Sequence, residues 1–445
     1  MLKTLRNAWA VPEIRRKLLF TLFIILIYRL GASIPVPFIN YGEVQKGIFS
    51  FVEESGGSLL SYFNILSGSA FGNATLLALS VSPYITASIV VQLLGVAIPA
   101  LEKLSKNGEE GRKKIEKITR YLTVALALIT AFGYYRLLRQ TSGIFFYDEG
   151  FGRVFSAIVI IACYTAGAML VMWLGQKIDE QGIGNGISII LFANIVGAFP
   201  NTLYTLFQNL KAAHTSGSKS LAVVIIYGVL TVLIIVASVV FVTYMSDAER
   251  RIPVQYAKRA VGRKMYGGQN SNLPIKLNMN GVMPIIFAST LVSLPTTIIL
   301  FAGGSTGDGF WAKVYTALSP VSLIYALVLL VLIIAFAYFY TSISFNPTEV
   351  ANNLMQNGGS VPGIRPGKPT AQYIKKVLNK VVLMGAFFLS VVAVIPIILN
   401  VISGGLLNVV SFSGSTLLIV VGVTLETFRE LEAQITMRHY KGFLK

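Results

Sequence analysis

Long apolar segments alternate with shorter polar ones along the whole chain. An apolar run of about 20 residues crosses the ~30 Å hydrocarbon core of a membrane as a helix, because its backbone polar groups then pair within the segment. The pattern predicts ten membrane-spanning helices. They cover residues 18–34, 74–98, 118–138, 154–174, 183–203, 221–245, 281–302, 321–345, 377–399 and 406–428.

The composition argues against a water-soluble enzyme. Of the 445 residues, 54% are hydrophobic and 13% are charged, whereas soluble domains carry about 25% charged residues. Cys163, His214 and His439 are the only cysteine and histidines, too few for a disulfide framework or a usual zinc site. The glycines at 182–186 and 367 lack the spacing of nucleotide-binding loops. We therefore predict that the chain is not an enzyme and uses no cofactor or metal.

The positive charge lies mostly on one side of the predicted spans. The formal net charge is +18, and 29 of the 37 Lys and Arg residues fall in or beside segments on the side of the N-terminus, against 7 on the other side. Because segments rich in Lys and Arg stay in the cytoplasm, both termini are predicted to be cytoplasmic. Arg29 is expected to reach the outer interface, which leaves the middle of the membrane without an ionisable side chain.

Residues 58–72 are apolar enough to enter a membrane but too short and too glycine-rich to cross it. Such backbone is tolerated at depth only where protein or water surrounds it. Two interpretations remain open, a re-entrant segment that fills a cavity from the outer side and an amphipathic turn on the surface.

Two function classes besides a conduit have to be weighed. The missing charges at mid-depth disfavour a secondary solute transporter, because ion-coupled transporters place ionisable residues there. A membrane scaffold without conduction is the other class, and it leaves the apolar segment at 58–72 without a purpose.

Two long basic loops face the predicted cytoplasm. The loop at 246–279 carries paired cations among tyrosines, and the loop at 346–376 holds Arg365 on a stiff turn between glycines and prolines. Such loops bind RNA phosphates or acidic protein surfaces, or they are simply solvated. The candidate docking residues are Arg250, Arg251, Lys258, Arg259, Arg263, Lys264, Arg365 and Lys368.

Several separated stretches form a specific combined pattern. They are SPYITASI at 82–89, MWLG at 172–175, GIGNGIS at 182–188, Arg251, YAK at 256–258, NP at 346–347, VPGIRPG at 361–367 and GSTLLI at 414–419. With these residues the chain resembles the bacterial SecY family of central subunits of the Sec protein translocon, from residue 18 to about 441. The resemblance implies an all-α polytopic membrane protein with ten transmembrane helices. These form two inverted five-helix halves, 1–210 and 211–445, around an hourglass pore with a re-entrant plug at 58–72.

The resemblance also implies functional residues. The pore ring comprises Val81, Ile85, Leu191, Ile286 and Ile419, with Val81 and Leu191 where some relatives have isoleucine. The plug residues are Leu60, Tyr62, Phe63, Ile65, Leu66 and Phe71. The second, third, seventh and eighth spans correspond to a lateral gate that includes Gln92, a residue that is otherwise explained as a polar contact between helices. The segment at 201–220 corresponds to an external hinge loop between the halves.

The function implied is a passive protein-conducting channel of the bacterial plasma membrane. Unfolded secretory proteins pass across it, and apolar segments leave sideways through the gate. The implied partners are the SecE and SecG subunits, the motor ATPase SecA, the ribosome through rRNA contacts of the basic loops, signal sequences and nascent polypeptides, and anionic lipids.

Overall fold

The structure is a computed structural model of the chain, and helices occupy all ten predicted spans. It describes residues 6, 8–44, 59–140, 143–147, 149–215, 221–256, 259–261, 264–266, 270–302, 309–320, 322–402 and 413–442. The helices at the predicted spans are α2 (Pro12–Gly31), α6 (Ser82–Ala97), α8 (Gly108–Leu138), α9 (Gly150–Gln181), α10 (Gly186–Thr215), α11 (Leu221–Asp247), α12 (Met283–Ala302), α14 (Leu323–Ser344), α16 (Lys368–Ile402) and α17 (Ser413–Gly442). The shorter helices are α3 (Tyr41–Val44), α5 (Leu59–Leu66), α7 (Pro99–Lys106), α13 (Phe310–Ala317) and α15 (Pro347–Gln356).

The chain is a helical multi-span membrane protein, but fewer of its described helices are both long and apolar enough to cross a membrane than the sequence predicts. Among the described residues, seven helices are long and apolar enough to cross a membrane, or eight if α6 and α7 form one bent span. The helices that fall short are α2 and α17, in which charges lie close to the apolar part. Lys17 and Arg29 flank it in α2, and Glu426 and Arg429 follow it in α17.

The second predicted span differs from a simple helix at both ends. Residues 74–81 are turns, and α6 begins only at Ser82, with Pro83 in its first turn, where proline costs no helical hydrogen bond. At the other end α6 and α7 meet at 105°. Ile98 at this corner has extended backbone, because the Pro99 ring that follows disfavours the helical conformation.

The prediction of an external hinge loop at 201–220 is wrong for most of this range. Helix α10 continues to Thr215, with Pro200 inside it. The stretch after Pro200 contains no glycine or further proline before Thr215, and it includes Leu, Gln, Ala and Lys, which favour helix.

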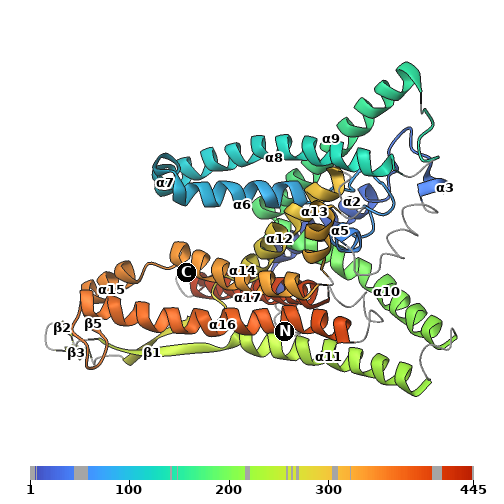
Figure 1. Ribbon diagram of the computed structural model, residues 1–445. Coiled ribbons are helices and arrows are strands. Elements are labelled where there is room, and N and C mark those ends of the chain that lie inside the picture. The colour runs from blue at the N-terminus through green and yellow to red at the C-terminus, as the bar shows by residue number, and fades with distance from the viewer. Residues whose placement is uncertain are drawn as a thin grey trace.

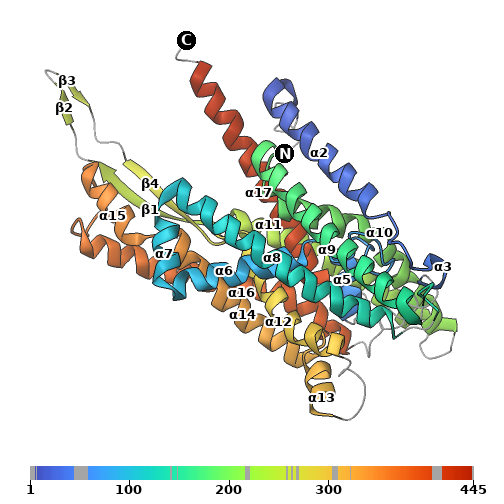
Figure 2. The same cartoon turned by 90° about the horizontal axis from the view of Figure 1, so that it is seen from above.

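Two groups of long helices lie on opposite sides of the molecule (Figure 1). One group contains α6, α8 and α9, and the other contains α11, α14, α16 and α17, with contacts mainly within each group. Three elements connect the groups: α12 contacts α6 and α8, α10 contacts α11 and α17, and α5 contacts both α10 and α12. The long helices run in the same general direction, with α15 and the strands toward one end and α3 and α13 toward the other (Figure 2).

The first basic loop forms a sheet that the sequence analysis did not predict. In it β1 (Glu249–Tyr256) pairs antiparallel with β4 (Asn270–Lys276) and with β5 (Gly359–Ser360). A second hairpin joins β2 (Arg259–Val261) to β3 (Lys264–Tyr266). Along β1, Ile252 and Val254 are buried while Arg251 and Gln255 are exposed, which is the alternation of a half-buried strand. The short β5 brings the second basic loop to the first.

The start of α2 and the end of α17 lie side by side. Ile14 belongs to one buried cluster with Ile183 and Leu431. The Lys17 ammonium donates a hydrogen bond to Oε1 of Gln434 at 3.3 Å. The first and last described helices therefore begin and end on the same side of the molecule.

Candidate functional site

The five predicted ring residues meet in one apolar cluster at the centre of the structure. They come from the turn before α6 and from α6, α10, α12 and α17, and each is at most 6% exposed. The positions are Val81, Ile85, Leu191, Ile286 and Ile419. Among the described residues, no buried side chain is Asp, Glu, Lys, Arg or His. The cluster therefore has no fixed charge that could bind an ion or a polar solute.

The described part of the 58–72 segment, residues 59–72, is buried rather than spread on the surface. Leu60, Tyr62 and Phe71 are 3–4% exposed, which is incompatible with an amphipathic surface turn. Ile65 and Leu66 pack against the ring cluster. Leu60 and Phe71 belong to a neighbouring cluster with Phe63 packed against it. The segment thus fills space between the ring cluster and the bundle of α8 and α9.

Tyrosine hydroxyls satisfy the irregular backbone of this segment. Tyr134 of α8 donates to the carbonyl of Phe71 at 2.5 Å, and Tyr164 of α9 donates to the carbonyl of Ala74 at 3.2 Å. Asn64 accepts a hydrogen bond from the amide of Gly72 at 2.9 Å. An unpaired peptide group in hydrocarbon raises the free energy by roughly several kcal/mol, so these carbonyl and amide groups need hydrogen-bond partners.

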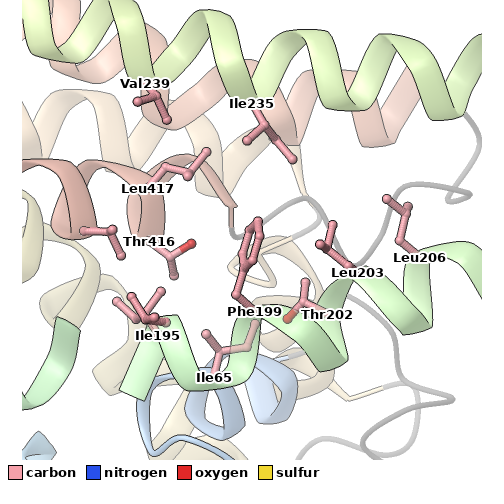
Figure 3. Close-up of a pocket in the computed structure, with 12 residues that line it drawn as sticks. Ile65, Ile195, Phe199, Thr202, Leu203, Leu206, Ile235, Val239, Thr416 and Leu417 are labelled. Atoms are coloured by element: carbon pink, nitrogen blue, oxygen red, sulfur yellow. The ribbon is translucent and has the colours of Figure 1, made fainter. Parts of the chain in front are cut away.

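Two apolar cavities lie on either side of this segment. One, of about 250 Å³, is bounded by α10, α11 and α17, with Ile65 of α5 at its edge (Figure 3). Phe199 of α10 extends into it, with Ile235 of α11 above and Leu417 of α17 nearby. The other, of about 180 Å³, lies between the segment and α6, α8 and α12. The packing around α5 is therefore incomplete at the boundaries between the two helix groups.

Gln92 takes part in a polar contact between the groups. The hydroxyl of Tyr340 in α14 donates to Oε1 of Gln92 in α6 at 2.6 Å, and Nε2 of Gln92 donates to Oγ of Ser88 at 3.1 Å. The ring of Phe287 in α12 packs edge-on against Tyr340, with centroids 5.2 Å apart. Sequence reasoning missed Tyr340, because nothing local indicates a partner 248 positions away.

A second close contact joins α8 to the connecting helix α12 and involves a glycine. A Cβ atom at Gly133 of α8 would lie 2.2 Å from Cδ2 of Phe301 in α12. The Phe301 ring therefore lies directly on the α8 backbone. No sequence motif marks this pair either.

The structure shows the partners of Arg29, and its reach to the outer interface stays a prediction. The partly buried guanidinium donates to the backbone carbonyls of Gly68, Ala193 and Asn194. A charged group in a low-dielectric region is stabilised by such carbonyl dipoles. The position of the Arg29 guanidinium is therefore determined by acceptors on two other segments of the chain.

The basic loops present exposed cations on and beside the sheet. Arg250 and Arg251 are exposed on β1, and Arg251 pairs with Glu249 at 2.7 Å. Arg365 and Lys368 are exposed next to the positive-φ residues Gly363 and Gly367. Lys258 and Arg263 lie outside the described residues, and for Arg259 and Lys264 the structure describes the backbone only, in β2 and β3.

Within the described ranges, no group of three or more His, Cys, Asp or Glu side chains could hold a metal ion. One ion pair found there joins two long helices: Arg429 of α17 contacts Asp247 at the end of α11 at 2.7 Å.

Comparison with known proteins identifies the family. The SecY family model matches residues 75–428. The protein translocase subunit SecY of Streptomyces galbus is 42% identical over 455 residues, covering 100% of both chains. A SecY structure in which the plug domain stabilises the closed state of the translocation channel and maintains a membrane seal superimposes with a TM-score of 0.63 at 17% identity, covering 94% of this chain and 92% of that one. Sec61 in the canine ribosome-channel complex superimposes with a TM-score of 0.60 at 15% identity, with the same coverage.

Proposed function

Because the chain belongs to the SecY family and is a protein-conducting channel of the Sec translocon, we propose how its residues perform this function. Unfolded secretory proteins pass along the axis through the ring of Val81, Ile85, Leu191, Ile286 and Ile419. Membrane segments leave sideways between the two helix groups. The channel itself supplies no energy.

The observation that carries this proposal is that the five ring residues, which come from the turn before α6 and from α6, α10, α12 and α17, all belong to one buried apolar cluster. Aliphatic side chains fit around an extended polypeptide without offering any one of its residues a strong binding site. When the ring is narrow it excludes water, and an ion that cannot keep its hydration shell does not cross. The same walls therefore pass a protein and retain ions at rest.

The segment at 58–72 acts as the plug of this ring. Its residues Leu60, Tyr62, Phe63, Ile65, Leu66 and Phe71 fill the space beside the ring in the closed state. The support is its burial and its contacts with both α10 and α12. The cavities on both sides leave it room to shift.

The two halves, residues 1–210 and 211–445, move apart when the channel opens, and each carries five of ten membrane-spanning helices. Their contact along α6 and α8 on one side and α12 and α14 on the other is the lateral gate. The Gln92–Tyr340 hydrogen bond and the Gly133–Phe301 contact hold this gate closed. Apolar signal sequences open it by replacing these contacts with their own.

The sheet and the adjoining turn form the docking surface for the driving partners, SecA and the ribosome. The exposed residues Arg250, Arg251, Arg365 and Lys368 provide the positive charge in the described part of this surface, and Lys258, Arg259, Arg263 and Lys264 belong to it as well. The pairing of β1 with β5 supports a single surface, since it joins both loops. SecE and SecG bind against the apolar faces of the membrane helices, and anionic lipids lie near the basic loops.

The channel is placed in the bacterial plasma membrane with both termini in the cytoplasm. The excess of Lys and Arg on the side of the termini supports this orientation.

Reconstitution tests the proposed function. Vesicles that contain the chain with its small partner subunits, together with SecA and ATP, are expected to take up a secretory precursor and protect it from added protease. Vesicles without ATP serve as the control. Uptake of a small solute without any precursor uptake would support the secondary transporter instead and contradict the proposal.

A further inference from the structure

Arg29 is an arginine in α2 whose side chain turns into the protein. Nη1 donates to the carbonyl of Gly68 at 3.4 Å, and Nη2 donates to the carbonyl of Asn194 at 3.4 Å and to that of Ala193. Gly68 follows the plug helix α5, whereas Ala193 and Asn194 belong to α10. One cation therefore connects three segments that are far apart in the sequence.

Two glycines make room for this guanidinium. A Cβ atom at Gly197 would lie 1.8 Å from Nη2 of Arg29, and a Cβ atom at Gly68 would lie 2.6 Å from Nη1. Gly68 also has a φ of 64°, which favours glycine. The local backbone is thus shaped around the Arg29 side chain, which indicates a defined position rather than one of many rotamers.

Asn194 adds a second set of contacts to the same end of the plug. It is fully buried, and Nδ2 lies 2.8 Å from the carbonyl of Leu66, 2.8 Å from the hydroxyl of Tyr28 and 3.3 Å from Oγ of Ser80. Ser80 itself donates to the carbonyl of Leu66 at 3.4 Å. The carbonyls of Leu66 and Gly68 are therefore both held by polar side chains of the surrounding helices and turns.

We propose that Arg29, Tyr28, Ser80 and Asn194 form a plug latch, in which Arg29 is a positioning residue that keeps the plug in its closed place. The plug also has one hydrogen bond to α12, between Tyr62 and Ser289. Its contacts with the hydrophobic ring cluster itself are apolar, and cavities interrupt them on both sides. The directional hydrogen bonds that the charged Arg29 donates then decide how easily this end of the plug leaves its closed position. The latch lies entirely within residues 1–210, so it ties the plug to that half. This inference rests on the proposed function, because it assumes that residues 59–72 close a channel.

When the plug moves, Arg29 loses the Gly68 carbonyl but keeps those of Ala193 and Asn194. The part of the opening cost that falls on Arg29 is then one charge-assisted hydrogen bond rather than an unpaired charge in the membrane, while Asn194 and Ser80 give up the Leu66 carbonyl. Such a bond changes an equilibrium by roughly tenfold or more. The latch can therefore hold the plug at rest without preventing its release.

The test measures how often the plug opens. Cys163, the native cysteine, is replaced by Ser, and a reporter cysteine is introduced by Leu60→Cys, because Leu60 is 3% exposed in the closed state. The assembled complex in vesicles is treated on its outer face with a membrane-impermeant maleimide, and the rate of alkylation is followed. Resting ion leakage from the same vesicles is the second readout.

Arg29→Met removes the hydrogen bonds and keeps an unbranched side chain, so alkylation is expected to be about tenfold faster or more, with increased leakage. Arg29→Lys, which keeps the charge but not the planar fork, is expected to fall between Met and wild type. Asn194→Ala is expected to accelerate alkylation as well. The matched control is Arg136→Met, which removes an exposed arginine in the last turn of α8 and is expected to change neither readout.

Equal alkylation rates for Arg29→Met, Asn194→Ala and wild type would overturn the latch. A rise that appears only together with lower protease resistance of the whole complex would also overturn it, because the residue would then stabilise the fold in general. If the Arg29→Met variant does not assemble, the alkylation rate of the Asn194→Ala variant alone decides whether the latch exists. The proposed function is judged separately by precursor uptake of the wild-type channel, which does not enter the alkylation measurement.

Discussion

The hydrogen bond between Tyr340 and Gln92 allows a precise test of the lateral gate. Tyr340→Phe deletes one oxygen atom and leaves the aromatic ring, which packs edge-on against Phe287 and Phe339 with centroids 5.2 and 5.7 Å away. The perturbation therefore removes the 2.6 Å contact between α14 and α6 and little else.

The magnitude follows from the surroundings of the pair. Gln92 is exposed, so its oxygen can find another partner after the substitution and no buried acceptor is left unpaired. The loss is then the net value of one neutral hydrogen bond, about 1 kcal/mol, which corresponds to a roughly fivefold shift toward the open gate.

The assay is export of a precursor with a weakened signal sequence, which opens the gate poorly. Tyr340→Phe is expected to increase its export by roughly two- to tenfold, the range that net hydrogen-bond energies allow. Tyr338→Phe is the matched control. Tyr338 lies in the same helix and donates to the carbonyl of Asn379 in α16 at 3.0 Å, a contact within one helix group.

Combining Tyr340→Phe with Gln92→Leu completes a double-mutant cycle. Because both substitutions remove the same bond, the double variant is expected to export no more than the stronger single variant. Equal export by Tyr340→Phe and Tyr338→Phe, or effects of the two gate substitutions that simply multiply, would refute the role of this bond in the gate.

Three further predictions concern the ring, the docking surface and the second gate contact. The isoleucines of the ring are Ile85, Ile286 and Ile419. Replacing all three by Ser is expected to raise the resting ion conductance of vesicles several-fold, because hydroxyl groups let water enter the constriction. Arg365→Glu is expected to abolish SecA-driven precursor uptake while the complex still assembles, because it reverses the charge on an exposed turn. Gly133→Val is expected to increase export of the weakened precursor, since it forces Phe301 away from α8 at a cost of about 1–3 kcal/mol.

The charge-reversal and glycine variants each have a control that shares the chemical change. Lys313→Glu reverses an exposed charge on α13, at the other end of the molecule, and should leave SecA-driven uptake unchanged. Gly95→Val adds a side chain to α6 where no neighbouring atom lies within 4 Å. Undiminished uptake with Arg365→Glu, unchanged conductance of the ring variant, or equal export by the two glycine variants would each contradict the corresponding prediction.

The apolar runs along the chain predict where helices lie, since the length of a run and the absence of charge are local properties. All ten runs coincide with a helix. Helices α2 and α17 are long enough to span a membrane but have charges close to the apolar run, and they are therefore not recognised as candidate spans. The same reasoning failed at residues 74–81 and 201–215, where composition allows both helix and turn and neighbouring segments decide.

The candidate functional residues likewise divide into those that local sequence identifies and those that depend on contacts between distant segments. Exposed cations such as Arg365 can be found from sequence, because a loop between apolar runs is solvated. The five ring positions came from the family resemblance, since hydrophobic periodicity does not distinguish a ring position from any other buried aliphatic residue. The partner of Gln92 could not be found at all, because a hydrogen bond between α6 and α14 depends on how two distant helices are placed.

The order of residues along the chain was enough to predict that this protein lies in a membrane, that its helices are apolar and that its positive charge is on one side. These features follow from transfer of each segment from water to lipid, which depends on local composition. The contact of Arg29 with the plug and the pairing of β5 that joins the two basic loops became visible in the three-dimensional fold alone. A donor inside the protein takes whichever acceptors the fold brings within hydrogen-bond distance, and no segment carries that information alone.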